Sequence, residues 1–322
     1  MKTTNASERS GAWIKRIRAF FMAQPLPSVV FQVSASAFSG INVSVSEKKI
    51  RHRAYLPLAS GLVEPHFDKP NIKQPASLAA VLKEGLAKLH YSGDNAACLL
   101  PEPCLKVFIF AFDSLPSSER ERLKLFRWRA KKQLPLLPDD VRLSYQIMKS
   151  NANASPKVLV SMARSAVLQE YEDLFASAGV KVGMVSSPTL SLLNLLNWAQ
   201  ERSFILVNIE DDSVSLAAVA DAELTLFRLK TFPAARSGLI PERHTIENIV
   251  TEIENTVHFL EDREKRSPNA LWVRSRSAEF LKSILSELES RLPLPVKLVD
   301  SPWLAGANTV DQALLAPLFG QV

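Results

Sequence analysis

Apolar and polar positions along the chain follow two periods, and the same order of periods occurs twice. Runs rich in Val, Ile and Phe predict short strands, and apolar positions three and four apart predict helices. In the first half these patterns predict strands at 29–34, 40–46, 49–56 and 96–100 and a helix at 76–89. Successive short strands joined by small turns are typical of an antiparallel meander.

A second group of elements follows in the middle of the chain. Residues 105–112 predict a strand, and residues 119–134 predict a helix that Pro135 ends. Two further strands are expected at 141–148 and 157–163. Together these segments predict a small β–α–β–β unit that is inserted into a larger domain.

The second half of the chain repeats the design of the first. Residues 203–232 read strand, turn, strand, tight turn, strand, as the opening segment does. The remaining pattern predicts helices at 166–180, 187–200, 244–264, 277–292 and 311–320 and strands at 182–188, 269–275 and 296–300. We therefore expect a duplicated α/β architecture of two related lobes around a cleft.

The N-terminal segment predicts a basic amphipathic helix. Large apolar residues fall on one face and cations lie off it: Trp13, Ile14, Ile17, Phe20 and Phe21 against Lys15, Arg16 and Arg18. Such a helix either lies on an anionic membrane surface or packs on the rest of the fold or on a partner. With 39 Lys and Arg against 33 Asp and Glu, the net charge of +6 also fits contact with an anionic surface.

Composition narrows the class of protein further. No apolar run reaches the roughly 18 residues of a membrane span, so a cytoplasmic protein is expected. Nucleic acid is not an expected partner, because the sequence has no aromatic-interleaved basic repeat or zinc-finger spacing. Cys98 and Cys104 form no disulfide framework, and the five histidines have no metal-ligand spacing, so no metal site is predicted.

Four segments, in matching order and spacing, resemble the PilM family of type IV pilus assembly proteins, which share the actin-like fold. They are VVFQVSASAFSGINVSVS (29–46), WRAKKQLPLLPDDVRLSYQIM (128–148), YEDLFASAGVKVGMVSSPTLSLLNLL (171–196) and FILVNIEDDSVSLAAVADAELTLFR (204–228). The resemblance implies an α/β, actin-like (ribonuclease-H-like, duplicated) fold of two lobes with a small inserted β-α-β-β subdomain. Its expected parts are an N-terminal basic segment 1–26, a first lobe 27–200 with the insertion at about 104–163, and a second lobe 201–322. The second lobe is expected to be reduced at its top after residues 231–239, with a C-terminal helix that returns toward the first lobe.

The resemblance also implies a role at the inner face of the bacterial inner membrane. The family binds the cytoplasmic tail of a single-pass partner, PilN, in a groove by the first lobe and the inserted subdomain, and so couples pilus motor ATPases to the pilus machine. For this chain we expect a PilN-like tail as partner, with strand 105–112 and helix 119–134 as one wall of the groove. The candidate anchors are Phe108, Phe110, Leu123 and Phe126, for which core packing inside the small unit is the alternative. An active actin-like ATPase and a cytoplasmic component of a type II secretion system are the alternative functions.

The nucleotide site that the resemblance implies is damaged at all three of its turns. In the first turn Gln32 stands where the family has Asp, Ser34 where it has Gly and Ser39 where it has Lys, while Ser36 keeps a hydroxyl. In the second turn Asn208 replaces Asp and Glu210 replaces Gly, so that a carboxylate stands where a phosphate would approach. The late turn offers Arg274, Ser275 and Arg276 and no glycine.

Without the acidic residues that organise Mg²⁺ and the small residues that admit phosphate, we expect a pseudo-ATPase scaffold without ATP or Mg²⁺ as cofactor. The alternative is a rearranged site, in which Arg274 or Arg276 binds phosphate and residues 208–212 hold a cation.

Overall fold

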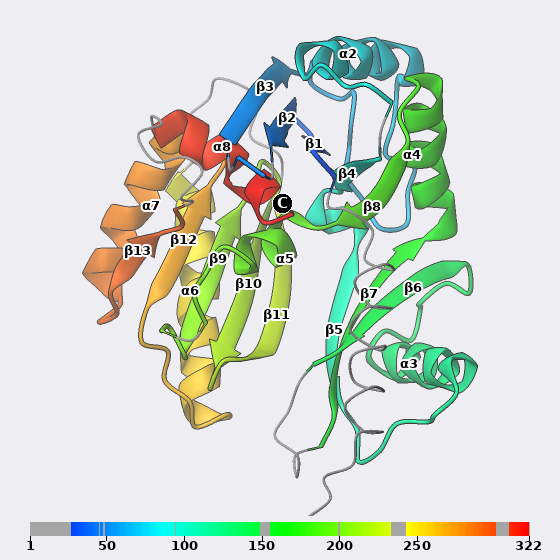
Figure 1. Cartoon of the computed structure of the whole chain (residues 1–322). Coiled ribbons are helices and arrows are strands. Elements are labelled where there is room, and N and C mark those ends of the chain that lie inside the picture. Colours follow the sequence, from blue (N-terminus) through cyan, green and yellow to red (C-terminus); the bar gives the residue numbers. More distant parts are fainter. Residues whose placement is uncertain are drawn as a thin grey trace, which may run out of the picture.

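The computed structural model describes residues 27–44, 46–47, 49–93, 95–148, 155–198, 200–232, 243–300 and 309–321. In this part of the chain the strands form two five-stranded sheets of the same topology and one three-stranded sheet (Figure 1). The duplicated α/β architecture expected from the repeated pattern is thereby confirmed. The predicted basic helix (Trp13, Lys15, Arg16, Arg18, Phe20 and Phe21) and the reduced region at 233–242 lie outside the described residues.

The first sheet has the order β3-β2-β1-β4-β8. Its strands are β1 (Val29–Val33), β2 (Ala37–Ser44), β3 (Lys49–Pro57), β4 (Ala96–Leu99) and β8 (Val182–Ser186). The first three form the predicted antiparallel meander, while β4 runs parallel to β1 and β8 parallel to β4. Every residue of β1 and β2 is buried, which requires that both faces of this sheet are covered.

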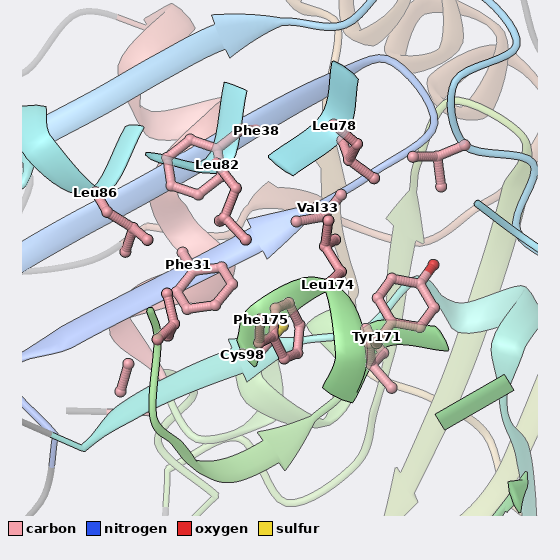
Figure 2. Close-up of a cluster of buried hydrophobic side chains, with 14 of the residues drawn as sticks. Phe31, Val33, Phe38, Leu78, Leu82, Leu86, Cys98, Tyr171, Leu174 and Phe175 are labelled. Atoms are coloured by element: carbon pink, nitrogen blue, oxygen red, sulfur yellow. The ribbon is translucent and has the colours of Figure 1, made fainter. Parts of the chain in front are cut away.

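Helices α2 (Pro75–Lys88) and α4 (Ser165–Ser177) cover one face of the first sheet. Phe31, Val33 and Phe38 of the sheet point toward these two helices (Figure 2). Tyr171 and Phe175 of α4 point back toward the sheet and belong to the same hydrophobic cluster. Gly85 lets α2 approach closely, because a Cβ there would lie 2.2 Å from the ring of Phe38. The opposite face is covered by α8 (Thr309–Phe319), near the C-terminus of the chain.

The second sheet repeats this layout with the order β11-β10-β9-β12-β13. Its strands are β9 (Phe204–Ile209), β10 (Ser213–Ala220), β11 (Glu223–Thr231), β12 (Leu271–Ser275) and β13 (Val296–Leu298). Helices α6 (Arg243–Asp262) and α7 (Ala278–Arg291) cover one face, and α5 (Pro188–Leu193) packs on the other through Leu192 and Leu193. The two inner helices, α5 and α8, contact each other and so join the lobes.

The inserted β-α-β-β unit is confirmed. It consists of β5 (Lys106–Ala111), α3 (Glu119–Gln133), β6 (Val141–Ile147) and β7 (Lys157–Arg164), in an antiparallel sheet of order β5-β7-β6. A short 3-10 turn, η1 (Glu102–Cys104), leads into it from β4, and β7 leads out into α4.

Two of the candidate groove anchors belong to the core of this unit, which corrects the expectation for them. Phe110 and Phe126 are buried where α3 packs on the sheet. Phe108 is half-buried and stacks on Phe110 with ring centroids 5.4 Å apart, and Leu123 is half-buried on α3. Aromatic side chains at alternate positions of β5 face the helix of their own unit, because that helix is the apolar surface nearest to them.

The helix expected at 187–200 is shorter than predicted. Ser187 caps its start as expected, by accepting a hydrogen bond from the Leu190 amide. Its end lies at Leu193, whose carbonyl oxygen accepts a hydrogen bond of 2.9 Å from the indole N–H of Trp198. None of the helices in the described part of the chain combines the length and the apolar character needed to span a membrane.

The close contact between α8 and α5 predicts that one methyl group added at Gly320 lowers the stability of the protein. A Cβ at Gly320 would lie 1.8 Å from the carbonyl oxygen of Ser191, which is backbone and cannot turn away. We expect Gly320→Ala to lower the free energy of unfolding by about 1–3 kcal/mol, measured by urea titration. Gly183→Ala is the matched control, since the atoms nearest to its added carbon belong to the Asn95 side chain, the closest at 3.2 Å. Equal urea midpoints for the two variants would contradict this packing.

Candidate functional site

The turns that end β1 and β9 meet between the two lobes. The hydroxyls of Ser34 and Ser36, in the β1–β2 turn, both donate hydrogen bonds to Oδ2 of Asp211, in the β9–β10 turn. These hydrogen bonds are 3.0 and 2.6 Å long. The two turns expected to face a nucleotide therefore contact each other directly.

Glu210 is the centre of this contact. Its carboxylate forms ion pairs with Arg274 and, at 3.5 Å, with Arg276. It also accepts a hydrogen bond of 3.3 Å from the amide of Gln32, across the lobes. All four side chains are buried. We call Gln32, Ser34, Ser36, Glu210, Asp211, Arg274 and Arg276 the interlobe cluster.

The strand register places the arginines in this cluster. Strand β12 runs parallel to β9, with Arg274 beside Asn208 and Ser275 beside Ile209. The guanidinium of Arg274, on β12, donates a hydrogen bond of 2.9 Å to Oδ1 of Asn208, on the neighbouring strand β9. Glu210 directly follows the end of β9. Because neighbouring parallel strands end at the same edge of a sheet, side chains at the ends of β9 and β12 converge.

The charges of the cluster are matched, which changes the electrostatic argument made from the sequence. Glu210 was expected to repel phosphate, but its charge is paired with two guanidinium groups, and Nε of Arg276 lies 3.4 Å from Asp211. In the alternative of a rearranged nucleotide site, Arg274 or Arg276 binds phosphate. In the structure both arginines instead form ion pairs with Glu210. Burial lowers the pKa of Arg274 and raises the pKa of Asp212 to about 7.

The remaining sequence candidates lie beside the cluster. Ser39 is buried on β2, opposite Gln32 in the β1–β2 register. The Ser275 hydroxyl accepts a hydrogen bond of 3.2 Å from the Ser277 amide, at the start of α7. Among the residues that the structure describes, no group of three or more His, Cys, Asp or Glu side chains could hold a metal ion.

Sequence reasoning missed Glu102, the buried carboxyl group of η1. It accepts a hydrogen bond of 2.7 Å from the Thr189 amide, and the hydroxyl of Thr189 accepts one of 3.0 Å from Asn208. A polar chain thus runs from η1 through α5 and β9 to Arg274 and the interlobe cluster. In the sequence Glu102 stands between two prolines, a context that signals only a turn.

A groove of 640 Å³ lies between the inserted unit and the first lobe. We call it the β6–β8 groove, because residues of both strands line it, and each is an edge strand of its sheet in the described part of the chain. Its lining comprises Leu105, 142–146, Leu159, 161–163, Leu168, Glu172, 185–187 and Leu190. Of the predicted wall, strand 105–112 contributes Leu105 to this groove, whereas the candidate anchors Phe108, Phe110, Leu123 and Phe126 do not line it.

The lining of the groove is suited to an extended segment. Apolar side chains of Tyr145, Met162 and Leu190 contribute to it, and Val185 on β8 is 49% exposed. An ion pair of 2.6 Å between Arg142 and Glu172 also lies in the lining. An edge strand offers unpaired backbone groups, so a segment laid along it gains main-chain hydrogen bonds as well as apolar contacts.

Comparison with known structures establishes the fold. The solved structure of a PilM-PilN type IV pilus biogenesis complex matches with a TM-score of 0.77, at 18% identity, over 92% of this chain and 98% of that chain. The cytoplasmic domain of EpsL, an inner membrane component of the type II secretion system of Vibrio cholerae, matches with a TM-score of 0.50, at 9% identity. That match covers 90% of this chain and 93% of the EpsL domain. No family model and no curated protein matches the sequence.

The protein therefore has the two-lobed actin-like fold with an inserted β-α-β-β unit. The PilM resemblance carried by the four sequence segments is confirmed as a likeness of structure that extends over nearly the whole of both chains.

The interlobe cluster predicts a large loss of stability when its central carboxylate is removed. Glu210→Ala would leave two buried guanidinium groups without their shared partner, so we expect a loss of about 3–5 kcal/mol in the free energy of unfolding. Glu254→Ala removes the carboxylate of a more exposed ion pair with Arg291 and should cost only about 0–1 kcal/mol. Urea titration of both variants makes the comparison. Equal losses would contradict the view that Glu210 compensates two buried guanidinium groups.

Glu102 predicts a pH dependence of stability. Burial raises its pKa from the ordinary value of 4.5 to about 7, so the folded protein holds a proton that the unfolded chain releases in this interval. The free energy of unfolding should therefore fall as the pH rises from about 4.5 to 7. Glu102→Gln keeps the acceptor for the Thr189 amide and cannot ionise, so it should be more stable than wild type at pH 8 by about 1–3 kcal/mol, and equally stable near pH 4.5. Urea titrations at both pH values test this, and a difference that does not change with pH would contradict it.

Proposed function

We propose that the protein is a PilM-like platform component whose activity is recognition. In this proposal the β6–β8 groove binds the cytoplasmic tail of a PilN-like single-pass membrane protein. The observation that carries the proposal is the presence of a groove lined by two edge strands, in a fold that matches the PilM-PilN complex over nearly its whole length. The protein would then lie at the cytoplasmic face of the bacterial inner membrane, held there by its partner.

The groove favours a short extended peptide with alternating apolar side chains. The backbone of such a peptide would pair with β6 or β8, and every second side chain would enter the apolar lining near Tyr145, Met162 and Leu190. Side chains set the register on the strand, while the hydrogen bonds of the backbone contribute affinity that depends little on sequence.

The interlobe cluster supports a scaffold rather than a catalyst. A nucleotide bound between the turns would have to separate Ser34 and Ser36 from Asp211, and Gln32 from Glu210. We therefore propose a pseudo-ATPase in which protein side chains hold the lobes together where active relatives hold nucleotide. Motor ATPases of the pilus would be partners of such a platform rather than activities of this chain.

An active ATPase and a type II secretion component are the two alternatives. The first requires the interlobe cluster to open, and titration calorimetry with millimolar ATP and Mg²⁺ tests it: a saturable heat of binding would restore it. The second draws on the likeness to EpsL, whose TM-score of 0.50 is lower than the 0.77 of the PilM complex.

The decisive experiment places a charge in the groove. The probe is a labelled synthetic peptide with the cytoplasmic tail sequence of a PilN-like single-pass membrane protein, and its binding is followed by fluorescence anisotropy. Val185→Asp changes an exposed position of β8 that lines the groove, so we expect the fold to persist and affinity to fall at least about tenfold. Leu298→Asp is the matched control, because Leu298 is 43% exposed on β13 and does not line the groove. Equal affinity of the two variants would exclude the groove as the tail site.

A further inference from the structure

Helix α3 presents an exposed surface that combines cations with large apolar side chains. Trp128 is 52% exposed on the helix, and Leu136, in the turn that follows it, is 90% exposed. Lys124, Arg127, Arg129, Lys131 and Lys132 are exposed around them. We call these seven residues the α3 surface. In Figure 1 the helix lies at the outer end of the inserted unit, away from the second sheet.

The charge of this surface is concentrated. Of the 15 residues of α3, seven are Lys or Arg and two are Glu, so this one helix carries +5 while the whole chain carries +6. Both glutamates lie in its first turn, whereas the cations continue to its end. In the described part of the chain, no carboxylate lies within ion-pair distance of Lys124 or Arg129, while Lys131 pairs with Asp139.

The apolar residues are held among these charges. The ammonium of Lys132 lies 3.8 Å from the ring centroid of Trp128, four residues earlier on the same face. Leu136 lies in the turn that follows the end of the helix at Gln133. The buried face of α3 is formed by Phe126 and Ala130, so the core of the unit does not need Trp128.

We propose that the α3 surface binds an anionic lipid bilayer. Tryptophan and leucine among lysines and arginines suit the boundary between headgroups and acyl chains, where the cations contact lipid phosphates and the apolar groups leave water. A convex helix at the end of the molecule can approach a flat surface. The choice of a bilayer over nucleic acid, which also offers phosphates, rests on the proposed function: strand β6 of the same unit lines the groove for a membrane protein's tail.

The test measures binding of the full chain to vesicles by sedimentation, without any tail peptide. Wild type should bind vesicles of phosphatidylcholine mixed with phosphatidylglycerol and should not bind phosphatidylcholine alone. The double charge reversal R129E/K132E should reduce partitioning at least about tenfold. The control K230E/K282E reverses two exposed cations of β11 and α7, so it changes the net charge equally and should bind like wild type. If both double variants lose vesicle binding equally, the binding depends only on the net charge of the protein, and the proposal is overturned.

Two further measurements make the outcome specific. Vesicles with brominated acyl chains should quench the fluorescence of wild type more than that of Trp128→Phe, because only wild type inserts Trp128; equal quenching would contradict the proposal. A chain without residues 1–24 should still bind the mixed vesicles, and loss of all binding would assign the membrane contact to the N-terminal segment instead. If R129E/K132E binds vesicles like wild type but loses binding to duplex DNA, the surface is a nucleic-acid site.

The tail-binding experiment remains independent of these results. R129E/K132E changes exposed residues outside the groove, so it should bind the tail peptide with the affinity of wild type. Failure of the vesicle test alone would therefore overturn the α3 proposal and leave the proposed function unaffected.

Discussion

The contact between the β1–β2 turn and the β9–β10 turn, centred on the buried carboxylate of Glu210, is the interaction on which the arrangement of the two lobes depends. Two guanidinium groups in a dry interior are costly unless an anion is placed between them, and the anion here is supplied by the protein itself. Gln32, Ser34 and Ser36 extend the contact to the first lobe by hydrogen bonds to Glu210 and Asp211. The two turns are thus joined by protein side chains, and the proposed scaffold role draws on this contact.

The interlobe cluster is also connected to the groove. The polar chain from Glu102 through Thr189 and Asn208 reaches Arg274 from the first residues of α5, and Ser187, which begins that helix, lines the β6–β8 groove. The groove wall is therefore positioned by the same contacts that fix the lobes. A shift of α5 against β9 or η1 would leave the Thr189 amide or the Asn208 side chain without its partner, so this polar chain favours one arrangement.

The inserted unit combines two surfaces that a membrane-side adaptor needs. Its edge strand β6 contributes to the groove, and its helix α3 carries most of the net charge of the chain on an exposed face with Trp128 and Leu136. In the proposed assembly, a tail would emerge from the bilayer beside a helix suited to lie on it. One small unit would then set both the partner and the orientation of the platform.

The sequence by itself determined the elements and their duplication, because strand and helix periods depend on local alternation of apolar side chains, as in the meander of β1–β3 and its repeat in β9–β11. It also identified the residues of the three turns, although not their partners. Only the tertiary structure decided that Glu210 is paired, that Glu102 joins the polar chain, and that Phe110 and Phe126 are core while Val185 lines the groove. These facts depend on which strands end at one edge and which helix covers which face. Such contacts join residues far apart along the chain, and no local pattern encodes them.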